Sequence, residues 1–83
     1  MDTFEKNLRL IGVITTLSET LASSGRTSTT LAEIAERLRR SFNEIVSIFG
    51  LLGIVPRSWD DPSSYLLSDI IESGTIHEVA ARY

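Results

Sequence analysis

Few residues in this chain are of the types that carry out catalysis or hold metal ions. There is no cysteine, and His77 is the only histidine. Protein zinc sites draw most of their ligands from closely spaced cysteines and histidines, so a single histidine predicts no metal site. The sequence also contains no Gly-rich phosphate loop, no G-x-S-x-G turn and no H-E-x-x-H pair. We therefore expect a protein that is not an enzyme, uses no cofactor or metal, and works by binding another macromolecule.

The residues best suited to binding are basic and polar, and they lie near the middle of the chain. Arginine side chains neutralise DNA phosphates, and three arginines lie within positions 37–40. The expected phosphate contacts are Arg26, Arg37, Arg39, Arg40 and Arg57. Asparagine pairs with adenine, glutamate accepts a hydrogen bond from cytosine, and serine bonds to either kind of edge. The expected base-reading residues are Ser41, Asn43, Glu44 and Ser47.

Other features of the charge pattern count against DNA. The net charge is −3, and residues 41–52 contain no lysine or arginine. Asp60 and Asp61 make the loop over residues 58–64 acidic, and carboxylates there would repel DNA phosphates. Arginines at the end of a helix are in any case favoured by the helix dipole. Double-stranded DNA and another protein are therefore both retained as partners.

Capping signals predict three helices in the first two thirds of the chain. Asp2 and Glu5 have the spacing of a capping box and open a helix over about 3–23, which Gly25 ends. Two more capping boxes, Thr30 with Glu33 and Ser41 with Glu44, open helices over about 31–39 and 42–52. The turn between these two helices is only about three residues long, which is typical of a helix-turn-helix.

The last third predicts a small β-hairpin and a short helix. After Gly53, Ile54–Arg57 is expected to form a strand, residues 58–64 a turn, and Tyr65–Leu67 the returning strand. A further capping-box spacing at Thr75 and Glu78 predicts a last helix over about 76–83. The fold class is therefore mainly α with a small β-hairpin, in a single domain over 1–83.

The segment Leu31–Gly50, LAEIAERLRRSFNEIVSIFG, resembles the core signature of the helix-turn-helix superfamily. The stretches Leu51–Val55 and Tyr65–Ser68 are similar to the ending of bacterial and archaeal winged-helix proteins. This resemblance implies a winged helix-turn-helix with a three-helix core, a two-stranded wing and a short C-terminal helix. One departure stands out, because Arg39 and Arg40 replace the glycine and apolar residue that most such turns contain. The positions that carry the signature are Ile34, Ala35, Leu38, Ile45 and Ile48.

Two features suggest protein contacts. The first helix has two adjacent apolar stripes, more than one small domain needs, so the second stripe is expected to form a homodimer interface. Trp59, at the tip of the expected wing, is a candidate partner anchor because tryptophan is enriched at binding hot spots, although it can equally pack onto its own domain. The expected dimer-interface residues are Leu10, Ile14, Leu17 and Leu21.

Together these features predict a winged-helix DNA-binding protein, a small dimeric transcriptional regulator. The alternative is a winged-helix protein–protein interaction or dimerisation module of a larger assembly that does not bind DNA. No stretch approaches the roughly 18–20 apolar residues of a membrane span, so no membrane contact is expected. Asp2 and Glu5 are untypical of a secretion signal, and a cytoplasmic location is expected.

Overall fold

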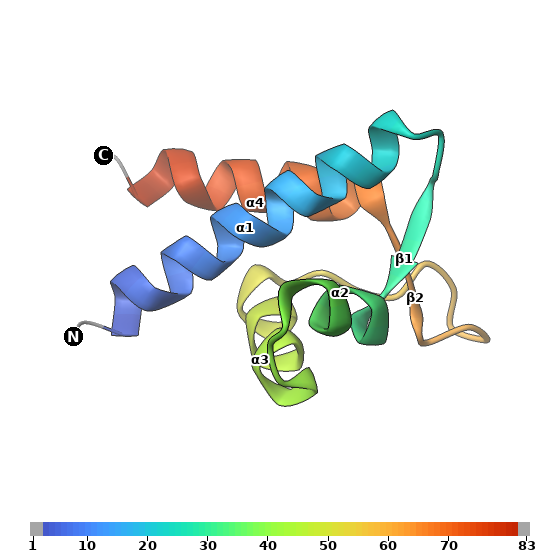
Figure 1. The fold of residues 1–83 in the computed structure, drawn as a ribbon, viewed down its shortest axis with the longest axis horizontal. Helices are drawn as coiled ribbons and strands as arrows, with labels where there is room; N and C mark the ends of the chain where they lie inside the picture. Colours follow the sequence, from blue (N-terminus) through green and yellow to red (C-terminus); the bar gives the residue numbers. More distant parts are fainter. Residues whose placement is uncertain (1–2, 82–83) are drawn as a thin grey trace.

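The computed structural model describes residues 3–81, which form four α-helices and a two-stranded antiparallel sheet (Figure 1). Figure 1 shows α1 and α4 running alongside each other, with α2 and α3 beneath them and the sheet at one end. The mainly helical class with a small sheet agrees with the sequence prediction. The elements are α1 (Thr3–Ser23), β1 (Ser28–Thr30), α2 (Leu31–Leu38), α3 (Phe42–Leu52), β2 (Ser64–Leu66) and α4 (Leu67–Ala81).

The first three helices lie where the capping signals place them. Ser41 and Glu44 form the complete capping box at the start of α3, and Gly53 ends that helix with φ 72°. Thr30 caps α2 by accepting a hydrogen bond from the backbone N–H of Glu33 at 3.1 Å. The carboxylate of Glu33 does not complete this second box, because it bonds to other residues instead. Asp2, the expected cap of α1, lies outside the described residues.

A short turn joins α2 to α3, and Arg39 occupies its left-handed position. Arg39 has φ 56°, and its backbone N–H donates to the carbonyl of Glu36 at 3.2 Å. The N–H of Arg40 donates to the carbonyl of Ala35 at 3.0 Å, which completes the end of α2. A non-glycine residue in this conformation costs about 1–2 kcal/mol. This position is the one at which the helix-turn-helix proteins that the sequence resembles commonly have glycine.

The predicted β-hairpin over 54–67 is wrong in its strand pairing. Residues 54–57 form no strand, and β2 pairs instead with β1, in the register Ser28↔Leu66, Thr29↔Tyr65 and Thr30↔Ser64. One backbone hydrogen bond, from the N–H of Arg57 to the carbonyl of Ser64 at 2.7 Å, joins the first expected strand to β2. Pro56 has no N–H to contribute to a ladder, whereas the β-branched threonines of β1 suit an extended strand.

The last helix is also longer than expected. α4 begins at Leu67, directly after β2, and continues through Thr75, which is therefore not a helix cap. The serines and Gly74 that suggested an interruption are accommodated by packing. A side chain at Gly74 would collide with the Thr15 hydroxyl of α1, so the glycine allows the two helices to approach closely. Ser73 donates from its hydroxyl to the carbonyl of Leu52 at 2.8 Å.

The core lies where α1 meets the other helices. Ile14 of α1 is fully buried together with Ile34 of α2, Ile45 of α3 and Ile70 of α4, so every helix contributes to one apolar cluster. Phe49 and Tyr65 pack edge to face, with ring centres 4.9 Å apart, and this contact joins α3 to β2. The tertiary contacts thereby hold the α2–α3 pair in a fixed position against α1.

Candidate macromolecule-binding surface

The turn between α2 and α3 forms the best-defined candidate site. Lys6 of α1 lines a shallow depression together with Arg40, Glu44 and Ser47, so the start of α1 lies beside the start of α3. Sequence reasoning missed Lys6 because it is more than 30 residues away along the chain and no local pattern marks it. We call this site the corner surface and define it as Lys6, Arg39, Arg40, Phe42, Asn43, Val46 and Ser47.

Of the expected phosphate contacts, only Arg39 and Arg40 belong to the corner surface. Arg40 lies 3.6 Å from the Glu44 carboxylate, and Arg57 lies 4.0 Å from Asp61 on the distant loop. Exposed pairs of this kind contribute little free energy and do not prevent a cation from meeting a phosphate. They do reduce the positive charge that the surface presents. Arg39 has no ion pair among the residues that the structure describes.

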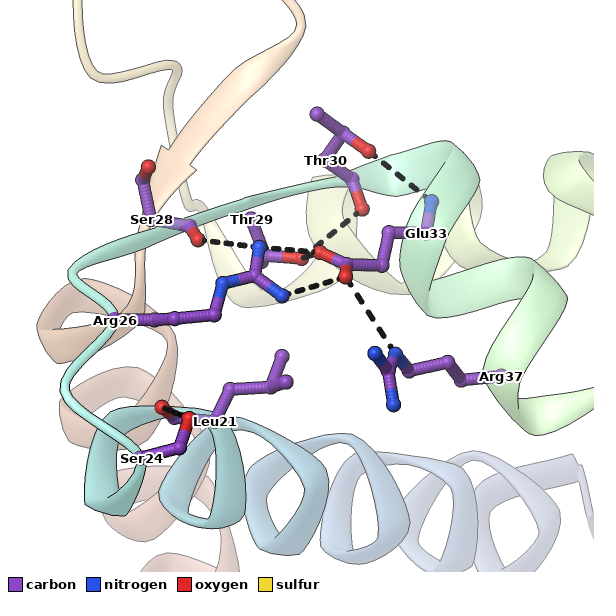
Figure 2. Close-up of polar contacts among 8 residues, drawn as sticks. All are labelled: Leu21, Ser24, Arg26, Ser28, Thr29, Thr30, Glu33 and Arg37. Carbon is purple, nitrogen blue, oxygen red and sulfur yellow. Dashed lines mark hydrogen bonds and ion pairs between the residues drawn. The ribbon is translucent and has the colours of Figure 1, made fainter.

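Arg26 and Arg37 point toward Glu33, as Figure 2 shows, and are not part of the corner surface. Both terminal nitrogens of Arg26 contact the Glu33 carboxylate at 2.6 Å, and one of them also donates to the carbonyl of Ser28 at 3.0 Å. The buried hydroxyl of Thr29 donates to the same carboxylate at 2.6 Å, and Arg37 lies 3.5 Å from it. These contacts fasten the chain before β1 to α2, so the role of Arg26 is structural.

Hydrogen bonding stabilises the ionised forms of Glu33 and Glu44. The bonds from Arg26 and Thr29 lower the pKa of Glu33 to about 2. The backbone N–H and hydroxyl of Ser41 lower the pKa of Glu44 from its ordinary value. Glu44 is therefore a carboxylate at neutral pH, engaged in its capping box. Among the expected base-reading residues, Ser41 and Glu44 already have partners within the chain.

The exposed surface of α3 is apolar along one side. Phe42 and Val46 are one helical turn apart and are 51 % and 42 % exposed. Asn43 and Ser47, the two remaining base-reading candidates, are also exposed and lie beside this apolar pair. Phenylalanine and valine form no hydrogen bonds to base edges, and their contacts there are limited to the methyl group of thymine. The corner surface thus combines an apolar pair on one side of α3 with cations on the other side.

The expected dimer interface on α1 is instead part of the protomer's own core. Leu10, Ile14 and Leu21 are buried within the chain, and Leu17 is half-buried against the same core. The prediction failed because α4 is almost twice as long as expected and covers the other apolar stripe of α1. Both stripes are therefore used inside one domain: Leu10, Ile14 and Leu21 have almost no surface left to offer a second copy, and Leu17 keeps only part of its own.

Trp59 does not pack back onto the domain. Its side chain is 93 % exposed, at the tip of the loop between α3 and β2. An isolated bridge between Ser58 and Asp61 closes the loop around it, and the Ser58 hydroxyl donates to the Asp60 carboxylate. This placement leaves Trp59 available as an anchor for a partner.

A second surface, which sequence reasoning missed, lies at the other end of α3. Residues Leu52–Val55 and one side of α4 line an open groove of about 420 Å³. Val55 and Ile76 are both more than half exposed there, and Asp69 and Glu72 are also exposed. We call this the acidic groove; its lining residues are Leu52, Gly53, Ile54, Val55, Asp69, Glu72, Ser73, Ile76 and His77.

Comparisons with known proteins found no relative of this chain. No family model, no curated protein and no solved structure matches the chain. Within residues 3–81, no group of three or more histidine, cysteine or acidic side chains is arranged to hold a metal ion. None of the helices in the same range has both the length and the apolar character required to cross a bilayer. The corner surface and the acidic groove are therefore the candidate sites of function.

Proposed function

We propose that this chain is a winged helix-turn-helix domain that docks onto another protein through the corner surface. The observation that carries the proposal is the exposed apolar pair on one side of α3, Phe42 and Val46. Each of these side chains has about half of its surface left to bury. Since complete burial of such a side chain contributes about 1.5–3 kcal/mol, the pair offers a partner a useful part of a binding free energy.

The order of elements supports the winged-helix part of the proposal. β1 precedes the α2–α3 pair, and its antiparallel partner β2 follows it. The short turn at Arg39 and the capping box at Ser41 set the two helices at a corner, as in a helix-turn-helix. The loop between α3 and β2 takes the place of the wing, and its hydrogen bond from Arg57 to Ser64 begins a ladder that does not continue.

A pair of matched variants tests the docking function. Val46 and Val13 are both exposed valines, at 42 % and 48 %, but Val13 lies on α1 outside the corner surface. We expect Val46→Ser to lose a protein that the wild-type chain captures from an extract of its own cells. Val13→Ser should capture it as the wild type does, and both variants should keep the wild-type circular dichroism. Undiminished capture by Val46→Ser would contradict the proposal.

DNA binding is a second candidate, and the placement of Lys6 favours it. Lys6 adds a third cation to Arg39 and Arg40 beside the start of α3, where Asn43 and Ser47 are exposed. This function requires binding to mixed-sequence duplex DNA that weakens steeply with salt. It also requires the loss of that binding in the Arg39→Glu/Arg40→Glu variant. Binding that is undetectable at about 50 mM salt would remove the DNA candidate.

A further inference from the structure

We infer that the partner of the corner surface is a second copy of this chain, which receives it in the acidic groove. The inference rests on the proposed docking function and names the partner for that same surface. It differs from the expected dimer, because Leu10, Ile14 and Leu21 of that interface are buried inside the protomer. The contact would join two different surfaces, the corner of one copy and the groove of the next.

The charges of the two surfaces are complementary. Lys6 and Arg40 lie together at the corner surface, with Arg39 in the adjoining turn, and these three cations outnumber the Glu44 carboxylate that pairs with Arg40. The acidic groove has Asp69 and Glu72 along α4, and none of the lysines and arginines within residues 3–81 lines it. Neither of these two carboxylates forms an ion pair with the residues that the structure describes. Opposite charges on two exposed surfaces favour encounter and fix the orientation of the contact.

The apolar side chains of the two surfaces match as well. Phe42 and Val46 stand out from the corner, while Val55 and Ile76 are exposed in the groove. Bringing these pairs together removes four exposed apolar side chains from water, with the charges at the border of the contact. An apolar centre with a polar rim is the usual arrangement of a protein–protein interface.

The positions of the two surfaces require a second molecule. The corner surface lies at the start of α3 and the acidic groove begins at its end, about 16 Å away for an 11-residue helix. One copy therefore cannot place its own corner in its own groove. Because each copy has one surface of each kind, the contact is head to tail, and it produces a chain or a closed ring of copies.

Charge reversal on each surface, followed by mixing, tests the inference. The groove variant is Asp69→Lys/Glu72→Lys, and the corner variant is Arg39→Glu/Arg40→Glu. All four residues are exposed, so the fold should be retained, which circular dichroism will verify. In sedimentation velocity up to about 1 mM protein, we expect the wild type to associate and to dissociate as salt is added. Each variant alone should associate at least about tenfold more weakly, and an equimolar mixture should recover association.

A control separates the groove from net charge alone. Glu19→Lys/Asp60→Lys changes the net charge by the same amount as the groove variant but lies outside both surfaces. This control should associate as the wild type does. A wild type that stays monomeric at every concentration would overturn the inference, as would a groove variant that associates unchanged or a mixture that does not recover.

The same measurements distinguish a failure of self-association from a failure of the docking function. If the wild type is monomeric while Val46→Ser still loses a captured protein, the corner surface docks onto a different protein. If the wild type neither associates nor captures a protein through Val46, both proposals are wrong. Salt-dependent binding of duplex DNA by the monomeric wild type would then assign the corner surface to DNA.

Discussion

Replacing Glu33 by glutamine removes the charge at the centre of the contact that fastens the chain before β1 to α2 (Figure 2). The pKa of Glu33 is about 2 in the folded chain, against an ordinary value of 4.5. At about 1.4 kcal/mol per pH unit, this difference corresponds to at most about 3.5 kcal/mol of stability. The side chain of Arg26 is 39 % exposed, so solvent screens the interaction. We therefore expect Glu33→Gln to lower the free energy of unfolding at pH 7 by about 1–2 kcal/mol.

The pH dependence of this loss follows from the direction of the pKa change. Because the folded state holds the carboxylate at a lower pKa, the stabilisation is complete above about pH 4.5. It declines as the pH falls from 4.5 toward 2, where the carboxylate becomes protonated in the folded state as well. The difference between wild type and Glu33→Gln should therefore shrink across this range. Comparing the two proteins at each pH cancels the titration of the other acidic groups.

Urea denaturation followed by circular dichroism measures the effect. Glu36→Gln is the matched control, since Glu36 is exposed on the same helix and forms no ion pair among residues 3–81. Its free energy of unfolding should stay within about 0.5 kcal/mol of the wild type. The reasoning is refuted if Glu33→Gln is as stable as the wild type at pH 7. It is also refuted if the loss is the same at pH 7 and at pH 2.

Three other positions and one matched control complete the predictions. Gly74→Ala should lower the unfolding free energy by more than about 2 kcal/mol, because its methyl group would collide with Thr15. Gly50→Ala, with open space around it, should raise that free energy by about 0.5–1 kcal/mol, and equal effects would contradict the close approach of α4 to α1. Arg39→Gly should raise the midpoint of thermal unfolding by relieving the left-handed conformation at φ 56°, and a lower midpoint would contradict this. Trp59→Ala should change the unfolding free energy by less than about 0.5 kcal/mol, since the side chain is 93 % exposed; a larger loss in urea denaturation would show that it packs on the domain.

Local signals in the sequence determined the first three helices and the turn between α2 and α3. Capping residues act over three positions, so the bonds at Ser41 and Glu44 form wherever the rest of the chain lies. Gly53 ends α3 for an equally local reason, because its left-handed conformation satisfies the last carbonyl groups. The sequence alone was therefore enough to assign Arg39, Arg40 and the exposed residues of α3 to one corner.

Pairings between distant segments were beyond these local signals. The sequence predicted that residues 54–57 would pair with β2, but β1 takes that place through contacts almost 40 residues apart along the chain. Glu33 looked like a capping residue, and only the position of Arg26 and Thr29 shows that its carboxylate fastens β1 to α2. The acidic groove joins the end of α3 to α4, so it exists only once both helices are in place.

The apolar pattern of α1 shows most clearly what the sequence alone predicts and what only the tertiary packing decides. Periodicity established that both stripes must be buried, which is correct for Ile11 and Ile14. It could not say what buries them, because apolar burial has no direction and a second copy covers a stripe as well as a neighbouring helix does. The longer α4 covers one stripe within the same chain, and Gly74 allows it to pack against Thr15 of α1. The chain encodes its helices locally, whereas the surfaces left for partners depend on how those helices pack.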